Sequence, residues 1–306
     1  MGFPRVPQPT RYAFRAMPHT PPPSPPRTFL QQADAGAARQ WWVPRLAPLL
    51  VWLLFLAMAH AAAEWAPVLL PLIYAAQITA TAGLLWRWRG LLPELSAKFH
   101  WAALPAALIV LVSWLLLGWW CRGNWDHAMH SIRTGSPMAG SGTSALAGLL
   151  AEHPALGRTV LGLRLLGMVF VVPCIEELLF RCAIARAFPT WRSAARPFLQ
   201  VISDWPWIGG WADRVLRAAT WHHQQSTPAV GRVTWVGIAI STLFFALNHQ
   251  RVDWAGAAVA GLVWHALLAL SNRPKPAGLG PAIWSHALVN LWLWIWCVWW
   301  GDWAFL

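Results

Sequence analysis

The chain has 306 residues, of which 57% are hydrophobic and only 11% are charged, about half the charged share of a soluble globular domain. A soluble fold could not bury so much apolar side chain, so the composition excludes that class and indicates a protein embedded in lipid. The net charge of +12 also occurs in nucleic-acid-binding proteins. Here, however, the arginines lie between apolar runs without forming a single basic stripe, so we expect no nucleic-acid partner.

Residues 1–40 are expected to form a disordered, Pro/Arg-rich cytoplasmic tail. They contain a proline-rich run from Pro21 to Pro26, several arginines, Asp34 as the single acid, and no apolar stretch to bury. An organelle transit peptide has a similar composition, but a cytoplasmic tail is the simpler interpretation.

Beyond this tail, the sequence predicts an all-α, polytopic membrane bundle of about seven transmembrane helices. A helix needs about 20 mostly apolar residues to cross the hydrocarbon core. The windows that approach this length are 46–63, 66–86, 101–120, 159–180, 233–250, 254–271 and 280–300.

Two other segments are expected to lie at the membrane surface. Residues 143–151 are apolar but too short to span, which predicts an interfacial or partly buried helix. Residues 189–229 are polar, with a tryptophan-rich middle from Trp205 to Trp211 that resembles an amphipathic surface segment.

The basic residues of the loops predict the orientation of the bundle. With the N-terminus inside and each window crossing once, 18 of the 23 lysines and arginines fall in inside segments and 4 in outside segments. Cytoplasmic loops carry an excess of Lys and Arg. We therefore expect a cytoplasmic N-terminus and a C-terminus on the opposite side.

Two adjacent acids occur within the fourth apolar run, although the whole chain has only 11. Charged side chains inside a span cost about 2.5–3.5 kcal/mol each on insertion scales, so they are rare and usually functional. Glu177 and Arg181 are four residues apart and should pair on one helix face. Glu176 points about 100° away and has no local cation, which suits a general base in a low-dielectric site.

Two later spans carry further polar residues at helical spacing. Phe245 and His249 are four apart, so the phenyl ring can pack under the imidazole, and His286 and Asn290 share one face of the last span. A lone histidine in a span is usually a packed, hydrogen-bonded residue, and His265 is the example here. Three helices that each contribute a polar face favour a common site.

Peptide hydrolysis requires an activated water, a proton donor for the leaving amine and hydrogen-bond donors for the oxyanion. Glu176 and His249 can activate the water and transfer the proton. His286 and Asn290 can bind the oxyanion, while Arg181 positions Glu177 as a supporting group.

The motifs Glu176-Glu177-x-x-x-Arg181, Phe245-x-x-x-His249 and His286-x-x-x-Asn290, in this order on separate spans, resemble those of the CPBP family. These are intramembrane glutamic proteases related to type II CAAX prenyl endopeptidases. The resemblance covers roughly residues 159–300, so we assign 159–306 to a protease core. Residues 41–158 form N-terminal transmembrane helices without a mapped motif.

The resemblance implies catalysis by Glu176 and His249, an oxyanion site of His286 and Asn290, and no cofactor or metal. Family members act in CAAX processing, bacteriocin immunity and the trimming of sorting signals. The implied partners are the lipid bilayer and a membrane protein or peptide substrate, with a sorting or processing system encoded nearby. The arginine- and tryptophan-rich composition predicts a bacterial inner (plasma) membrane location.

Other functions remain open at this point. A zinc protease could use Glu176, His249 and His286 as ligands, although no His-Glu-x-x-His helix is present. A cysteine enzyme could use Cys174, which points about 200° away from Glu176 on a helix. A non-catalytic scaffold or immunity protein could retain the site, whereas a transporter would be expected to show an inverted repeat.

The window boundaries conflict with a shared site. If the fourth span ends near residue 180, Glu176 lies towards the cytoplasmic side and His249 towards the other. The site therefore predicts that the fourth helix continues to about residue 188, that the fifth begins in water before 233, or that the chain re-enters near Pro173.

Overall fold

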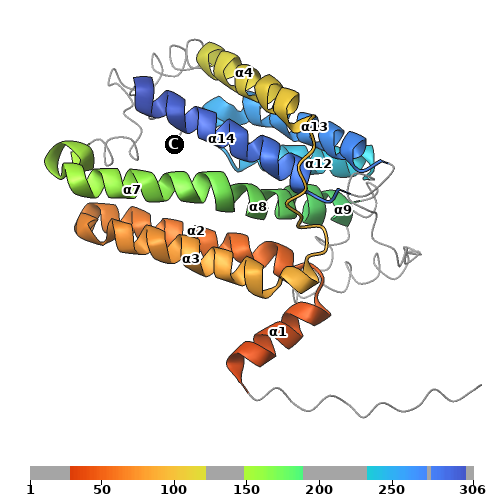
Figure 1. Cartoon of the computed structure of the whole chain (residues 1–306), viewed down its shortest axis with the longest axis horizontal. Helices are drawn as coiled ribbons and strands as arrows, with labels where there is room; N and C mark the ends of the chain where they lie inside the picture. Colours follow the sequence, from red (N-terminus) through yellow and green to blue (C-terminus); the bar gives the residue numbers. More distant parts are fainter. Residues whose placement is uncertain (1–27, 122–147, 189–232, 274–276, 301–306) are drawn as a thin grey trace, which may run out of the picture.

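The computed structural model describes residues 28–121, 148–188, 233–273 and 277–300, and within these ranges every element is a helix (Figure 1). Six of the described helices are long and apolar enough to cross a membrane, which makes the chain an integral membrane protein. They are Val43–Ala63, Pro67–Arg87, Ala103–Cys121, Pro154–Ala187, Arg251–Ser271 and Gly280–Trp299.

The first helix, α1 (Phe29–Arg39), lies in the segment predicted to be disordered, so that prediction is wrong for these residues. A capping box between Thr28 and Gln31 satisfies backbone N–H groups at its start. Asp34 pairs with Arg87 at 2.7 Å, and this hydrogen bond lowers the pKa of the Asp34 carboxyl. Polar contacts therefore hold a helix that has no long apolar face. Residues 1–27 lie outside the described part.

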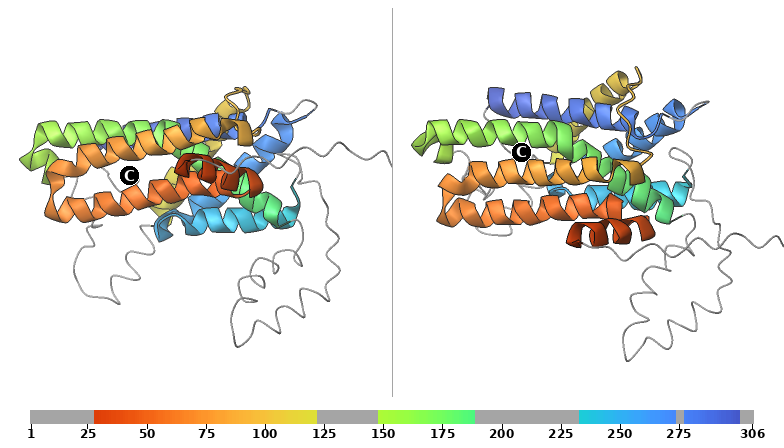
Figure 2. Two further views of the ribbon diagram at one scale, coloured as in Figure 1. Left: turned by 90° about the horizontal axis from the view of Figure 1, so that it is seen from below. Right: turned by 60° about the horizontal axis from the view of Figure 1, so that its bottom comes forward.

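Helices α2 (Val43–Trp65) and α3 (Leu70–Arg87) run antiparallel and lie side by side (Figure 2). The 3₁₀-helix η1 (Pro67–Leu69) makes the turn between them. After a second 3₁₀ turn, η2 (Arg89–Leu91), the chain enters α4 (Ala103–Cys121), whose surface is apolar all round, as expected of a helix surrounded by lipid and other helices.

One continuous helical run of 34 residues, roughly 50 Å long at 1.5 Å per residue, carries the acidic motif. It consists of α7 (Pro154–Leu166), the π-helix η4 (Gly167–Val171), α8 (Val172–Glu176), the π-helix η5 (Glu177–Ile184) and α9 (Ala185–Ala187). The fourth span thus continues seven residues beyond the predicted end at 180, which moves Glu176 away from the helix terminus.

The π-helical segment η4 lies immediately before Pro173. A proline lacks the backbone N–H that an α-helix needs, and its ring collides with the carbonyl of the residue four positions earlier. A wider helical turn at this point relieves that collision. Single π turns are frequent at functional sites, and here η5 begins at Glu177, directly after Glu176.

The last three helices are α12 (Trp235–Leu247), α13 (Trp254–Ser271) and α14 (Gly280–Trp300), with the 3₁₀ turn η6 (Arg251–Asp253) before α13. With 13 residues, α12 is about 20 Å long, too short to cross a hydrocarbon core of about 30 Å. It lies beside the α9 end of the bundle and stops well short of the opposite end (Figure 2). The predicted span at 233–250 therefore corresponds to a short helix, and a count of seven spans stays a prediction.

Small residues on α13 allow this helix to pack closely between two others. A Cβ at Gly256 would lie 3.1 Å from the Cα of Trp114 on α4, and one at Gly261 would lie 2.7 Å from the Thr242 methyl group on α12. Close backbone approach at such residues is typical of membrane helix packing. These contacts fix α13 against α4 and α12 against α13, and so they position the turn between α12 and α13.

Tryptophans at the helix ends are exposed to the surroundings, as expected of side chains at the headgroup level. Among them are Trp65, Trp86, Trp101, Trp119, Trp235 and Trp299. The predicted surface segment at 189–229 and most of 143–151 lie outside the described residues. Which side of the membrane each loop faces stays a prediction from the loop charges.

Candidate functional site

Three separate parts of the bundle carry the predicted site residues. The long helix contributes the acidic motif at the junction of α8 and η5, the turn after α12 contributes one histidine, and α14 contributes a histidine and an asparagine. In chain order these residues are Glu176, Glu177, Arg181, His249, His286 and Asn290.

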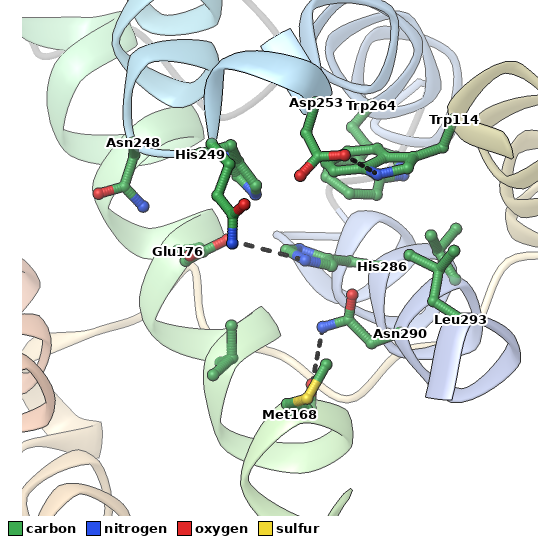
Figure 3. Close-up of a pocket in the computed structure, with 13 residues that line it drawn as sticks. Trp114, Met168, Glu176, Asn248, His249, Asp253, Trp264, His286, Asn290 and Leu293 are labelled. Atoms are coloured by element: carbon green, nitrogen blue, oxygen red, sulfur yellow. Dashed lines mark hydrogen bonds and ion pairs between the residues drawn. The ribbon is translucent and has the colours of Figure 1, made fainter. Parts of the chain in front are cut away.

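Four of these side chains, those of Glu176, His249, His286 and Asn290, line one cavity of about 260 Å³ (Figure 3). A water molecule occupies about 30 Å³ in the liquid, so the cavity has room for several. Its wall also includes the exposed residues Asn248 and Gln250 in the turn after α12. The short α12 therefore brings an irregular, polar turn to the edge of the cavity, which is where non-helical backbone is tolerated in a membrane.

His286 lies between the two glutamates. Its Nδ1 is 3.1 Å from Glu177 Oε1 and its Nε2 is 3.7 Å from Glu176 Oε2, and the ring is 3% exposed. The indole of Trp264 stacks on the imidazole with ring centroids 4.2 Å apart and planes 22° apart. The ring plane of His286 is therefore fixed by contacts to both ring nitrogens and to one face.

Arg181 is buried behind the cavity with Glu177. Arg181 Nε is 3.4 Å from Glu177 Oε2, the pairing that the four-residue spacing predicts. Among the described residues, none accepts a hydrogen bond from the three guanidinium nitrogens. The guanidinium carbon lies 4.3 Å from the Phe245 ring centroid and 5.1 Å from that of Trp264. The positive charge is thus balanced by one carboxylate and by aromatic faces.

His249 is held in one orientation by its own helix. Its Nδ1 is 2.8 Å from the carbonyl oxygen of Phe245, and a carbonyl can only accept, so Nδ1 carries the hydrogen. The Phe245 ring lies against the imidazole at a centroid distance of 4.6 Å, as the spacing of the two residues predicts. Nε2 is consequently the nitrogen of the neutral ring that can accept a proton.

Asn290 donates a hydrogen bond from Nδ2 to the carbonyl oxygen of Met168, at 2.8 Å. Met168 belongs to the π-helix η4, where i to i−4 hydrogen bonding is disrupted. The asparagine therefore links α14 to the widened turn of the long helix. One N–H of the amide makes this bond. The amide has a second N–H, and the Asn290 side chain lines the cavity.

The sequence patterns did not identify three further residues of the cavity wall. Trp114 on α4 packs edge-on against His249 at 5.2 Å and donates a hydrogen bond to Asp253 at 3.2 Å. Trp264 stacks on His286. Asp253 is one of only 11 acids and directly precedes an apolar run, a signal that could have drawn attention to it.

The histidine expected to be structural has that role. His265 Nε2 lies 3.2 Å from the Ser241 hydroxyl, which in turn donates to the carbonyl oxygen of Phe180 at 2.5 Å. His265 is buried and is not among the residues that line the cavity. It links α13 to α12, and through Ser241 to the long helix.

This geometry bears on two of the alternative functions, the zinc protease and the cysteine enzyme. Among the described residues, no three His, Cys, Asp or Glu side chains are grouped as ligands of one metal ion. The Cys174 thiol lies 3.3 Å from the carbonyl oxygen of Phe170 and is not part of the cavity wall. The arrangement thus presents two carboxylates and two imidazoles, rather than a thiol, to the cavity.

A comparison of the sequence with protein families agrees with this geometry. Residues 158–292 match the model of the family described as type II CAAX prenyl endopeptidase Rce1-like, and this range contains all six predicted site residues. No curated protein and no solved structure matches the chain.

Proposed function

The part of the chain that carries the site belongs to the Rce1-like type II CAAX prenyl endopeptidases, a family of membrane proteases, and we propose that the protein hydrolyses a peptide bond inside the membrane. Glu176 and His249 would activate the attacking water. The substrate would be a membrane protein or a membrane-associated peptide.

One observation carries this proposal. The Glu176 carboxylate, two imidazoles and an amide, from the long helix, the turn after α12 and α14, line a single cavity that can hold water. Ionisable groups at this depth are costly, and a purely structural role would need one ion pair. Glu177 with Arg181 already forms such a pair. The structural ion pair therefore does not need Glu176, His249 and His286, and these side chains are available for catalysis.

In the proposed reaction, a water in the cavity attacks the carbonyl carbon of the scissile bond. Glu176 and His249 act together to accept a proton of the water. On His249 the accepting atom is Nε2, because Nδ1 donates to the carbonyl oxygen of Phe245. The same proton then passes to the amide nitrogen as the carbon–nitrogen bond breaks. The products are a new carboxyl terminus and a new amine.

The developing oxyanion would be bound by His286 and Asn290. Glu177, which pairs with Arg181, accepts the Nδ1 hydrogen of His286. In the protonated ring, Nε2 also donates, to Glu176 before the substrate binds and to the oxyanion afterwards. The stacked indole of Trp264 holds the ring in this orientation, and the second N–H of Asn290 adds another donor.

The biological role that fits this chemistry is removal of a C-terminal membrane anchor or sorting signal in a bacterial plasma membrane. The substrate must enter a cavity within the bundle, so it must itself be apolar near the scissile bond. A neighbouring gene for a sorting enzyme, a prepeptide or a toxin would indicate which of the roles implied by the family applies.

The proposal is tested with purified full-length protein in lipid nanodiscs and a library of apolar, transmembrane-length peptides, with products identified by mass spectrometry. Glu176→Gln should slow cleavage by about 10²–10⁴-fold, the usual contribution of a general base. Glu152→Gln, which removes an exposed acid on a described helical segment, is the matched control and should cleave at the wild-type rate.

Cleavage should persist in the presence of a zinc chelator. Loss of activity that added zinc restores would instead support a metalloprotease. Correctly folded wild-type protein that cleaves no peptide in the library would contradict the proposal and favour a scaffold or immunity protein that retains the site.

A further inference from the structure

Two side-chain amides flank His249 in the turn after α12, and the proposed reaction uses neither of them. Asn248 is the C-cap residue of α12, and Gln250 has an extended backbone at the N-cap position of η6. Both residues are exposed and both line the cavity, where Asn248 lies next to His249 in the view of Figure 3. The two amides therefore lie at the open edge of the cavity.

Other side-chain amides of this bundle bind main-chain groups. Gln77 donates to the carbonyl oxygen of Trp52, and Asn290 donates to that of Met168, both at 2.8 Å. Asn272 donates to two carbonyl oxygens and accepts from two backbone N–H groups. Within the described part of the chain, the two amides of the turn make no hydrogen bond of this kind.

An amide without a partner is costly inside a membrane. Because α12 ends partway along the bundle, the turn lies away from the ends of the long helices, where headgroups and water would solvate it (Figure 2). Transfer of an amide into an apolar medium without a hydrogen bond is unfavourable, and non-helical backbone at this depth occurs where it lines a cavity. The amides thus face the water of the cavity, where a ligand can reach them.

A peptide that is cut within a membrane presents groups that match these amides. The N–H and C=O groups of a membrane helix are paired within the helix, and opening the helix around the scissile bond leaves them without partners. A carboxamide carries one acceptor oxygen and two N–H donors. It can therefore pair with either polar group of an opened main chain.

We propose that Asn248 and Gln250 form a subsite that binds the main chain of the substrate next to the scissile bond. This inference rests on the proposed protease function. His249 stands between the two amides in the chain, so a peptide held by both passes the proposed water-activating imidazole. The ligand is an extended stretch of apolar peptide, which the subsite recognises through its backbone rather than through one particular side chain.

The test measures binding apart from cleavage. Glu176→Gln protein in nanodiscs is titrated with fluorescent members of the library of apolar peptides. In this background, Asn248→Leu and Gln250→Met keep the size of each side chain and remove its hydrogen bonds. Each change should weaken binding by about two- to tenfold, as expected for one neutral hydrogen bond. Gln32→Met removes an exposed amide of α1 outside the cavity, and this matched control should leave the affinity unchanged.

Peptides with one ester in place of a backbone amide show whether the contact is to the main chain, because an ester lacks the N–H group. At the contacting positions, the ester should weaken binding to the Glu176→Gln protein by about two- to tenfold. This loss should disappear when Asn248→Leu and Gln250→Met are also present. The ester changes the free peptide identically in both titrations, so an ester effect that is the same in both proteins at every position overturns main-chain recognition.

Cleavage by the wild-type protein separates this inference from the proposed function. Peptide binding that survives both amide changes, together with cleavage, overturns the subsite and leaves the protease intact. Binding that depends on the two amides, together with no cleavage of any peptide, supports the subsite and contradicts the protease. A library in which no peptide binds the Glu176→Gln protein contradicts both.

Discussion

At the scale of single residues, the burial of Arg181 carries a large free-energy cost, because its charge is removed from water. Arg181 is 1% exposed, and within the described part of the chain its guanidinium nitrogens have no hydrogen-bond partner and it forms an ion pair with Glu177. Each member of such a pair depends on the other, since removal of one leaves an uncompensated charge in a low-dielectric interior.

We predict that Arg181→Met destabilises the protein by about 3–5 kcal/mol, because Glu177 is left charged and buried. The double variant Glu177→Gln/Arg181→Met should be markedly more stable than Arg181→Met alone. Denaturation in detergent, followed by tryptophan fluorescence, measures both. A double variant as unstable as the single one would show that the ion pair is not the reason for the loss.

Side-chain contacts within one helix could be predicted from the sequence, whereas side-chain contacts between helices could not. The contacts of Glu177 with Arg181 and of Phe245 with His249 follow from a spacing of four. The insertion of His286 between two glutamates depends on how α14 is rotated against the long helix. Hydrophobic patterning carries little information on that rotation when a helix is apolar all round.

At the scale of elements, the site depends on a long helix and a short one. The predicted window ended at 180 because Arg181 interrupts the apolar run, but pairing with Glu177 allows the helix to continue. Of the three ways to reconcile the depths of Glu176 and His249, continuation of the helix is the one observed. Neither the π-helical turns nor the end of α12 near residue 247 has a signature in apolar periodicity.

Substitution of Gly237 tests whether close packing on α9 positions α12. A Cβ at this residue would collide with the carbonyl oxygen of Ala185 on α9. Gly237→Ala should therefore destabilise the protein by about 1–3 kcal/mol, as overpacking usually does, and it should reduce cleavage by displacing His249. Gly83→Ala on α3 is the matched control, because nothing lies within 4 Å of its added Cβ. Equal behaviour of the two variants in melting and activity would contradict close packing of α12 on α9.

At the scale of the whole molecule, a second buried polar cluster joins the N-terminal helices to the protease core. Glu94, in the loop between α3 and α4, accepts hydrogen bonds from Arg45 of α2 at 2.5 Å and from the Cys182 thiol of η5 at 2.8 Å. Arg186 lies 3.9 Å from the same carboxylate oxygen. Backbone bonding of Leu279 to Glu94 adds the start of α14 to this junction.

This cluster predicts an acid-dependent loss of stability. Burial raises the pKa of Glu94, but the hydrogen bonds from Arg45 and Cys182 outweigh it and hold the pKa below its ordinary value of 4.5. A depressed pKa in the folded state means that the stabilisation is complete above pH 4.5 and is lost as the pH falls through the folded-state pKa. Melting temperatures measured between pH 3 and pH 7 should show this fall (roughly the range in which carboxylates titrate). Glu94→Gln should be less stable at neutral pH and should lack this component, and an unchanged pH profile would contradict it.

The membrane class and the all-α architecture could be predicted because composition alone decides whether lipid must cover the surface. The number of spans was less predictable, since apolar windows do not distinguish a helix that crosses the bilayer from α12, which ends partway along the bundle. Tertiary packing of α12 against α13, and of α13 against α4, rather than hydrophobic length, positions the turn that carries His249 and Asp253.

The most direct measurement of the central claim is a double-mutant cycle on the cleavage rate, with Glu176→Gln, His249→Gln and the double variant in nanodiscs. If the two side chains act on one water, each single change slows cleavage by about 10²–10⁴-fold, and the double variant is about as slow as the worse single one. Effects that multiply, or wild-type cleavage by either single variant, would contradict the shared site.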